Sequence, residues 1–432
     1  MSAPSVAELG RIFWGKHRHD VMFTRGRWYT YADGVWSPIH NLTMARMIWR
    51  FLNGQAGLER KPWKVSLYKL TGTRAYVQAE AHVPGVEVDA IPDLINLRNG
   101  VLDVVRGTLL PHDPKMRITT QLPFDYTPGA SHDLWDMFLR STFVVPGGTQ
   151  CDKDLVAFVQ EAIGYSLTTD VSHHVSFWCV GEGANGKGVL FHVLECLCGD
   201  AAMALNVALL SVQREHYQLA KLAGKRIALC SETASTRNLV DDATVKALVS
   251  GDTMGVRLPY QEPTELHPRA KLWWSMNHFP AVADASEGFW RRVCVIPFNR
   301  TFGPAERILD LKERLEVEMP GIFVWAIEGL ARLKDRGHFK LPPQVAAMTK
   351  QYRLESNPVE LFVEDRCTTD DPQARARSSV IYQAYKTWCF DNTFKPLSSP
   401  RFKRGMERLG FSHKRDGHGY YFHGVSVATS IP

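Results

Sequence analysis

A glycine-rich stretch at residues 181–188 has the residue types and spacing that bind phosphate. It reads Gly-Glu-Gly-Ala-Asn-Gly-Lys-Gly, follows an apolar run at 177–180 and precedes a predicted helix at 189–196. Glycines let backbone N–H groups turn inward around a phosphate, and the helix N-terminus adds partial positive charge. The amine of Lys187 can reach the β- and γ-phosphates. We therefore predict an ATP-binding loop made of Gly181, Gly183, Ala184, Asn185, Gly186, Lys187, Gly188 and Val189.

The last position of this loop departs from the usual pattern. A Ser or Thr hydroxyl commonly binds Mg²⁺ there, whereas this chain has Gly188. Two readings follow: the metal is held through water and another group, or the loop binds nucleotide with little hydrolysis. We favour the first reading.

Three further positions carry side chains suited to nucleotide hydrolysis. Glu232 follows an apolar run at 227–230, and a carboxylate at such a strand end can hold Mg²⁺ or polarise the attacking water. Asn277 follows a predicted strand at 271–276, where it can bind the γ-phosphate or merely form an Asx turn before Pro280. Arg291 and Arg292 precede the strand 293–298; such a pair often faces solvent, but in ring ATPases an arginine can reach a neighbour's γ-phosphate. We predict catalytic roles for Lys187, Glu232, Asn277, Arg291 and Arg292, with Glu232 also a metal ligand.

The elements that must position these residues alternate between strands and helices. Predicted strands at 175–180, 227–231, 271–276 and 293–298 indicate a mainly parallel sheet covered on both faces. Earlier, turn signals at Asp33-Gly34 and Asn99-Gly100 predict two β-hairpins. Helical spacing dominates from about 130 to 163 and again at 308–317 and 322–333.

Composition sets broad limits. The formal charge of +6 and pI near 8.8 permit a polyanionic partner. The sequence carries no apolar run long enough for a membrane span and no signal-peptide core, so we expect a cytoplasmic protein. Its 8 cysteines form no CxxC pair and are expected to be reduced, with a metal site around Cys196 and Cys198 as the weaker alternative.

Taken in order, these motifs resemble superfamily 3 helicases, in particular the phage, plasmid and poxvirus-type primase-helicases. The resemblance rests on the GxGxNGK loop, Ser231-Glu232-Thr233, the Asn-x-x-Pro at 277–280 and the Arg-Arg strand ending at 296–298. Segments at 219–226 and 246–252 also match this group, and weaker likenesses extend to 99–103, 320–326 and 382–389.

The resemblance implies an α/β fold with an AAA+-type ATPase core. We expect an N-terminal α+β domain at 1–125, a helical linker at 126–170, the ATPase core at 171–304, a helical segment at 305–357 and a winged-helix domain at 358–432. It further implies a hexameric ring that hydrolyses Mg-ATP at subunit interfaces and moves 3′-to-5′ on single-stranded DNA. Because the motor-associated region begins almost at Met1, we expect no primase domain here and a separate primase or polymerase as partner.

Two groups of residues are expected to contact DNA. In superfamily 3 motors a hairpin before the Asn strand points into the channel, and here it carries Arg257, Tyr260, Arg269 and Lys271. In the tail, a basic helix and a basic hairpin are typical of a winged helix on duplex DNA. Their cations are Arg401, Lys403, Arg404, Lys414 and Arg415.

Two other functions remain open at this point. In the first, ATP controls a DNA-binding replication initiator or switch that does not unwind DNA, a reading supported by Gly188. The second, a small-molecule kinase, leaves Asn277, the arginine pair and the basic tail unexplained.

Overall fold

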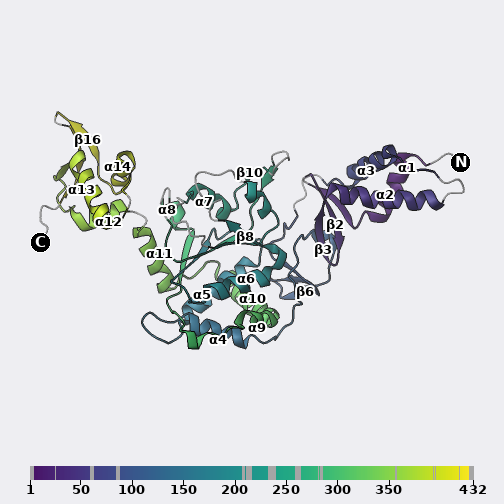
Figure 1. Ribbon diagram of the computed structural model, residues 1–432, viewed down its shortest axis with the longest axis horizontal. Coiled ribbons are helices and arrows are strands. Elements are labelled where there is room, and N and C mark those ends of the chain that lie inside the picture. The colour runs from purple at the N-terminus through teal and green to yellow at the C-terminus, as the bar shows by residue number, and fades with distance from the viewer. Residues whose placement is uncertain are drawn as a thin grey trace.

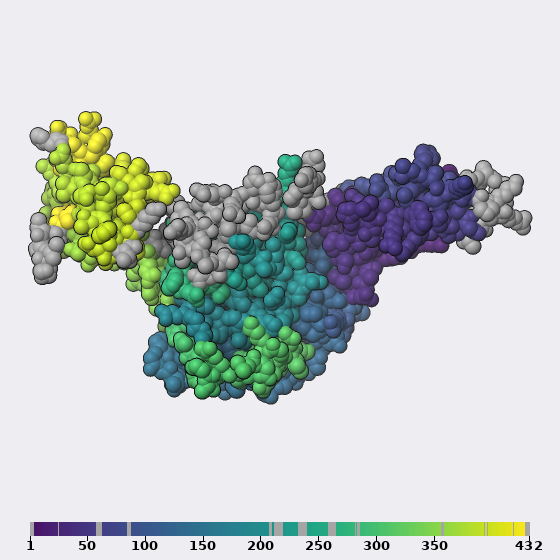
Figure 2. Space-filling view, in the orientation of Figure 1, coloured from purple at the N-terminus to yellow at the C-terminus, as the bar shows by residue number. Residues whose placement is uncertain are grey.

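The computed structural model places an α/β body between two smaller units. It describes residues 4–24, 26–58, 63–83, 88–206, 210, 217–231, 240–257, 264–280, 282, 286–355, 358–392, 394, 396–417 and 419–427. The N-terminal unit lies at one end of the molecule and the C-terminal unit at the other (Figure 1). Both project from the central body (Figure 2). No helix among the described residues is long and apolar enough to cross a membrane.

Three helices and a small antiparallel sheet form the N-terminal unit. The helices are α1 (Val6–His17), α2 (Asn41–Leu58) and α3 (Leu67–Ala81), and the strands are β1 (Val21–Thr24), β2 (Arg27–Ala32) and β3 (Val35–Ile39). The predicted hairpin at Asp33-Gly34 is confirmed, because Ala32 pairs with Val35 across the β2–β3 turn. Buried Phe13, Trp28, Ile48 and Val77 hold the helices to the sheet.

A second antiparallel sheet joins this unit to the central body. Its strands are β4 (Leu94–Leu97), β5 (Gly100–Asp103) and β6 (Thr108–Leu110). The predicted hairpin at Asn99-Gly100 is confirmed by the pairing of Leu97 with Gly100. Ile95 and Leu102 are buried in the same core as the helices of the central body, so this sheet packs against the central body.

The central body is built on a five-stranded parallel sheet. Its strands are β7 (Ser176–Val180), β8 (Ala202–Asn206), β9 (Ile227–Ser231), β12 (Lys271–Met276) and β13 (Val293–Pro297), in the order β13-β7-β12-β9-β8. The sequence of β7 is a continuous apolar run because both of its faces are buried. Phe177 and Cys179 lie in one core, and Trp178 and Val180 lie in the other. Four of the five strands were predicted, and the edge strand β8 was not.

Helices cover both faces of this sheet (Figure 1). On one face lie α4 (Asp133–Thr142), α5 (Lys153–Ser166), α6 (Lys187–Cys198), α9 (Leu311–Val317) and α10 (Met319–Arg336). On the other lie the 3-10 helix η4 (Tyr217–Leu222), α7 (Asp242–Ser250), α8 (Glu287–Trp290) and α11 (Pro343–Glu355). Short 3-10 turns occur at η1 (Pro114–Met116), η2 (Gly199–Ala201) and η5 (Pro304–Glu306).

The C-terminal unit has its own core and follows α11. It contains α12 (Pro358–Arg366), α13 (Ser378–Asp391) and α14 (Ser399–Arg408), with the strands β14 (Cys367–Thr368), β15 (Arg375–Arg377), β16 (His413–Asp416), β17 (Gly419–His423) and β18 (Ser426–Val427). The strands β15, β17 and β16 form a small antiparallel sheet. Phe362, Tyr385, Phe402 and Phe422 pack together beneath it.

Helix α11 is anchored to the central body by Tyr352. Its ring stacks on Phe279 with a centroid separation of 4.2 Å, and its hydroxyl donates to the Pro280 carbonyl at 2.8 Å. The side chain is fully buried. The chain therefore leaves the central body through a helix that is fixed to the segment following β12.

Helices α5 and α10 approach closely because glycines stand at their contact. A Cβ added to Gly164 would lie 2.2 Å from the Ala326 carbonyl oxygen, and one added to Gly329 would lie 2.7 Å from the Gln160 backbone. Beside this contact, buried Glu161 accepts hydrogen bonds from two arginines of α10. The two helices lie on one another with almost no room for adjustment.

We expect Gly164→Ala to destabilise the protein by about 1–3 kcal/mol, because the new methyl group must displace backbone. Thermal melting measures this as a lower transition temperature. Gly54→Ala is the matched control, since that helical glycine has nothing within 4 Å of an added Cβ, and we expect it to be neutral or slightly stabilising. Equal melting of the two variants would contradict the tight α5–α10 contact.

Candidate nucleotide site

The glycine-rich loop connects the end of β7 to the start of α6. Ala184 and Gly186 have φ of +57° and +91°, so the backbone reverses twice in the left-handed region before the helix begins. A Cβ on Gly181 would lie 2.4 Å from the Phe298 carbonyl oxygen. The N–H of Phe302 donates to the Ala184 carbonyl at 2.8 Å. The segment that follows β13 therefore fixes the shape of the loop.

Lys187 and Asn277 meet at the edge of the sheet, as their positions after adjacent strands predict. The Lys187 Nζ donates to Asn277 Oδ1 at 3.0 Å and also to the Gly181 carbonyl oxygen. Strands β7 and β12 are parallel neighbours with Val180 opposite Met276, so their carboxyl ends lie side by side. Lys187 is only 6% exposed. Its amine is thus held at the mouth of the loop by acceptors that a phosphate oxygen can replace.

The remaining loop positions fit the predicted phosphate cradle. The N–H of Lys187 donates weakly to Asn185 Oδ1 at 3.4 Å, and the Asn185 amide reaches the Phe298 carbonyl at the same distance. A Cβ on Gly188 would meet nothing within 4 Å. Packing therefore does not require glycine at the position where related loops carry a hydroxyl.

The predicted catalytic acid Glu232 lies outside the described residues. Strand β9 ends just before it, at Ser231, and Ser231 stands opposite Ser275 of β12. The sheet order thus brings the end of β9 next to the strand that carries Asn277. The role of Glu232 as acid and Mg²⁺ ligand stays a prediction.

A cavity of about 760 Å³ opens beside the loop. Gly181, Glu182 and Asn277 line its side toward the sheet, while Phe394 and Arg401 line it from the C-terminal unit. Arg401, predicted as a DNA contact, therefore lies at a cavity shared with the nucleotide loop. Sequence reasoning had no signal for this, because it depends on how the C-terminal unit packs.

The arginine pair lies at the opposite end of the sheet from the loop. The β13–β7 register sets Val293 opposite Ser176 and Pro297 opposite Val180. At about 3.3 Å per residue, the pair is roughly 16 Å from the loop edge along the strand. Arg292 donates to Ser250 Oγ at 2.9 Å and to the Gly288 carbonyl at 2.5 Å. Burial, together with neighbouring Arg291, lowers the pKa of Arg292, whereas Arg291 is exposed.

The predicted channel hairpin is present, but one of its cations is buried. Strands β10 (Met254–Val256) and β11 (Thr264–Leu266) pair antiparallel. Arg257 is exposed at the tip side and Arg269 is half-buried, while Tyr260 lies outside the described residues.

The prediction that Lys271 contacts DNA is wrong. It is only 2% exposed, and its amine donates to the Thr168 carbonyl and lies 4.8 Å from the Tyr165 ring centre. Burial lowers the pKa of Lys271 well below its usual value. The prediction failed because Lys271 is the first residue of the buried strand β12 and not the last residue of the exposed hairpin.

All five predicted cations of the tail are exposed, as a DNA-binding surface requires. Three lie on α14 and two on β16: Arg401, Lys403, Arg404, Lys414 and Arg415. The guanidinium of Arg415 lies 5.6 Å from the ring centre of Tyr420 on the paired strand β17. The predicted basic helix and basic hairpin are therefore both present.

Comparison with known protein families accounts for most of this architecture. Residues 10–144 match the model described as D5 N terminal like, and residues 354–420 match the model described as Poxvirus D5 protein-like. Residues 179–292, which hold the loop and Asn277, match a family of unknown function, DUF5906. The chain thus resembles the D5-like superfamily 3 primase-helicases on both sides of its central body. The resemblance read from the motifs is thereby confirmed.

Relatives of this D5-like protein occur in large DNA viruses. A "Putative helicase" of Acanthamoeba polyphaga mimivirus is 24% identical over 69% of this chain and 33% of the relative. A "Putative helicase" of Frog virus 3 (isolate Goorha) is 25% identical over 54% of this chain and 26% of the relative. The chain thus spans a third or less of the length of these two relatives.

The fold also matches a solved structure over nearly its whole length. The apo structure of the NrS-1 C-terminal region superposes with a TM-score of 0.54, covering 98% of this chain and 100% of that one at 11% identity. At 11% identity the match shows a similar fold and nothing about function. It supports a mixed α/β architecture around the parallel sheet.

We expect Lys187→Ala to lower ATP turnover at least about a hundredfold, as removal of a phosphate-facing charge does. The fold should persist, because the amine bonds polar acceptors and not the core. Lys350→Ala, an exposed lysine on α11, is the control and should match wild type. Phosphate release and thermal melting provide the two measurements. Wild-type turnover in a folded Lys187→Ala variant would remove the nucleotide-site assignment.

Proposed function

We propose that this chain is the ATP-driven motor of a replicative DNA helicase from a phage, plasmid or related mobile element. The Lys187–Asn277 hydrogen bond is the observation that carries the proposal. It unites a phosphate-binding lysine and a polar strand-end residue on adjacent parallel strands, which is the arrangement that nucleotide hydrolysis needs. The matches to the D5 family models and the helicase names of the relatives support the same reading.

In the proposed reaction, the γ-phosphate of ATP displaces the Gly181 and Asn277 oxygens from the Lys187 amine. Asn277 is then available to hold the attacking water or a phosphate oxygen. Glu232 is proposed to polarise that water and to bind Mg²⁺, which neutralises phosphate charge when bound. Water is proposed to fill the place of the missing hydroxyl at Gly188.

The position of the arginine pair supports the proposal that a neighbouring subunit completes the site. At roughly 16 Å along the strand from its own loop, Arg291 is too far to serve the phosphates of the same chain. We assign Arg291 to a neighbour's γ-phosphate in a ring, proposed to be hexameric, because Arg292 is held within its own chain by Ser250 and Gly288. The exposed side chain of Arg291 is available for such a contact.

DNA is proposed to bind at two places. Single-stranded DNA would pass the hairpin carrying Arg257, Tyr260 and Arg269, with 3′-to-5′ movement. Duplex DNA would lie on the C-terminal unit, proposed as a winged helix with α14 as its recognition helix and β16–β17 as its wing. Lys403, Arg404, Lys414 and Arg415 would contact phosphates there.

Arg401 is proposed to serve the nucleotide as well as, or instead of, DNA. Among the described residues that line the cavity it is the one arginine, and it shares that lining with Glu182 and Asn277. A phosphate seated at Lys187 would place its outer oxygens toward this cavity. The C-terminal unit would then respond to whether nucleotide is bound.

A separate primase or polymerase is the proposed partner, with the host cytoplasm as the place of action. The second candidate function is an ATP-controlled initiator or switch without unwinding, which Gly188 continues to favour. The two differ in whether ATP hydrolysis separates DNA strands.

Strand displacement on a forked duplex tests the proposal directly. We expect unwinding that requires Mg-ATP and a 3′ single-stranded tail, and that Lys187→Ala abolishes. ATP-dependent DNA binding without displacement would support the switch instead. DNA-independent ATPase with no DNA affinity would remove both.

Subunit mixing tests the arginine assignment. Arg291→Ala subunits added to wild type should lower ATPase more than in proportion to their share, since each would disable a neighbour's site. Arg292→Ala should mainly lower thermal stability, because its hydrogen bonds are internal. A strictly proportional loss with Arg291→Ala would contradict catalysis in trans.

Arg401 and Arg404 provide a matched pair on α14. We expect Arg401→Ala to weaken ATP binding without DNA about tenfold, as loss of a hydrogen bond to a charged group does. Arg404→Ala should keep wild-type ATP affinity and lower the slope of log duplex affinity against log salt by about 0.9. If Arg401→Ala affects only the DNA measurement, its nucleotide role is refuted.

A further inference from the structure

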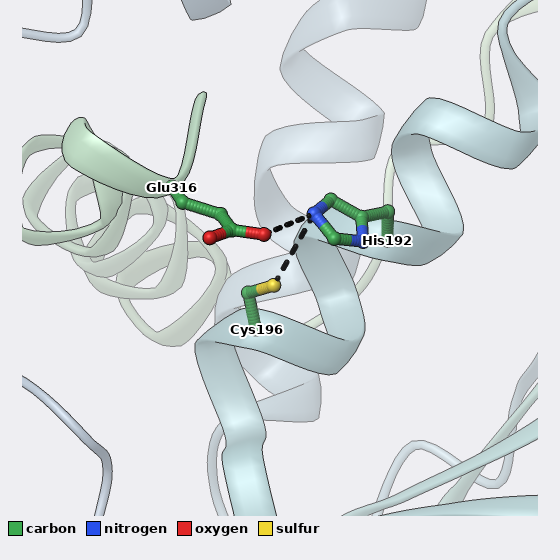
Figure 3. Close-up of side chains that lie close together, drawn as sticks. All are labelled: His192, Cys196 and Glu316. Atoms are coloured by element: carbon green, nitrogen blue, oxygen red, sulfur yellow. Dashed lines mark hydrogen bonds and ion pairs between the residues drawn. The ribbon is translucent and has the colours of Figure 1, made fainter. Parts of the chain in front are cut away.

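Three metal-ligating side chains converge on the helix that begins at the nucleotide loop. His192 and Cys196 lie one turn apart on α6, so they share a helix face, and Glu316 of α9 stands opposite them. The His192 Nε2 lies 2.9 Å from Glu316 Oε1 and 3.5 Å from Cys196 Sγ, and the three ligand atoms lie within 4.8 Å of one another. Figure 3 shows the carboxylate and the sulfur meeting at the same ring nitrogen.

We propose that His192, Cys196 and Glu316 bind a zinc ion. Nitrogen, sulfur and carboxylate oxygen are the donors that Zn²⁺ takes, at about 2.0–2.3 Å each. Tetrahedral ligands at those distances lie about 3.4 Å from one another. The His192–Glu316 and His192–Cys196 separations bracket this value, and the third pair lies within 4.8 Å. Side-chain shifts of about 1 Å would therefore admit the ion. Glu316 has a side chain that is 51% exposed, which leaves the fourth position to water.

The electrostatics of this cluster favour a cation. The carboxylates of Glu316 and Glu195 place negative charge beside the Cys196 thiol. A bound Zn²⁺ would balance the negative charge of the two carboxylates. The Cys196 thiol would lose its proton to solvent when it bound the metal. The imidazole would give its Nε2 lone pair to the metal in place of the contact with Glu316.

The neighbouring thiol does not belong to this site. Cys198 is fully buried in the core, and burial raises its pKa to about 12. Among the described residues, the metal-ligating group at His192 contains Cys196 and Glu316 but not Cys198. The cluster instead joins α6, whose first residue is Lys187, to α9 on the covering layer of helices.

The zinc site does not depend on the proposed motor activity, and its test reads metal binding alone. Metal-stripped full-length protein would be titrated with Co²⁺ as a spectroscopic probe. We expect one ion per chain, a tetrahedral cobalt spectrum with a sulfur-to-cobalt charge-transfer band, and displacement of cobalt by Zn²⁺. Cys196→Ser should remove the charge-transfer band, and Glu316→Gln should weaken binding at least about tenfold.

Cys367→Ser is the matched control, because this half-buried thiol on β14 is remote in sequence and lies in the core of the C-terminal unit. It should bind cobalt as wild type does. Zn²⁺ should raise the melting temperature of wild type and of Cys367→Ser, but much less that of Cys196→Ser. Absence of the band, or a band that survives Cys196→Ser, would overturn the site and leave an ordinary His192–Glu316 ion pair.

Discussion

The parallel pairing of β7 with β12 is the constraint on which the proposed nucleotide site depends. One residue of slip in this register would turn Val180 and Met276 to opposite faces and part Lys187 from Asn277. The pairing is held by aromatic side chains from both strands. Phe177 packs on Trp273 at 4.6 Å on one face, and Trp178 packs on Trp274 at 4.8 Å on the other. Because large rings pack on both faces of these two adjacent strands, we expect a single register between β7 and β12 to be stable.

Buried cations fasten the opposite end of the sheet. Arg226, 2% exposed, donates from Nε to Thr120 Oγ1 at 3.1 Å and from Nη1 to the Leu167 carbonyl. Lys271 donates to the adjoining Thr168 carbonyl. Both groups thus supply hydrogen bonds to backbone carbonyls that would otherwise be buried without partners. The strands of the sheet begin next to the loop that follows α5. The proposed nucleotide site lies at their opposite, carboxyl ends.

The sequence predicted the strands that carry Lys187 and Asn277 better than it predicted their surroundings. The strands that carry Lys187 and Asn277 are long apolar runs with a glycine-rich or polar end, which is a strong local signal. Strand β8 was missed because Ala202–Asn206 is a short edge strand of mixed burial. Lys271 was misjudged because a charged residue at a strand start gives no sign of whether it points inward. The place of Arg401 depends on how two separate cores pack, which no residue pattern encodes.

Tyr352 couples helix α11 to the segment that follows Asn277. Its ring is clamped on Phe279 and Trp178, and its hydroxyl holds Pro280, three residues beyond Asn277. These contacts join the segment after Asn277 directly to the helix. Tyr352 lies three residues before the end of α11 at Glu355, which is about 4.5 Å along the helix axis. The segment that follows Asn277 is therefore in contact with α11 within one helical turn of the point where the chain continues into the C-terminal unit.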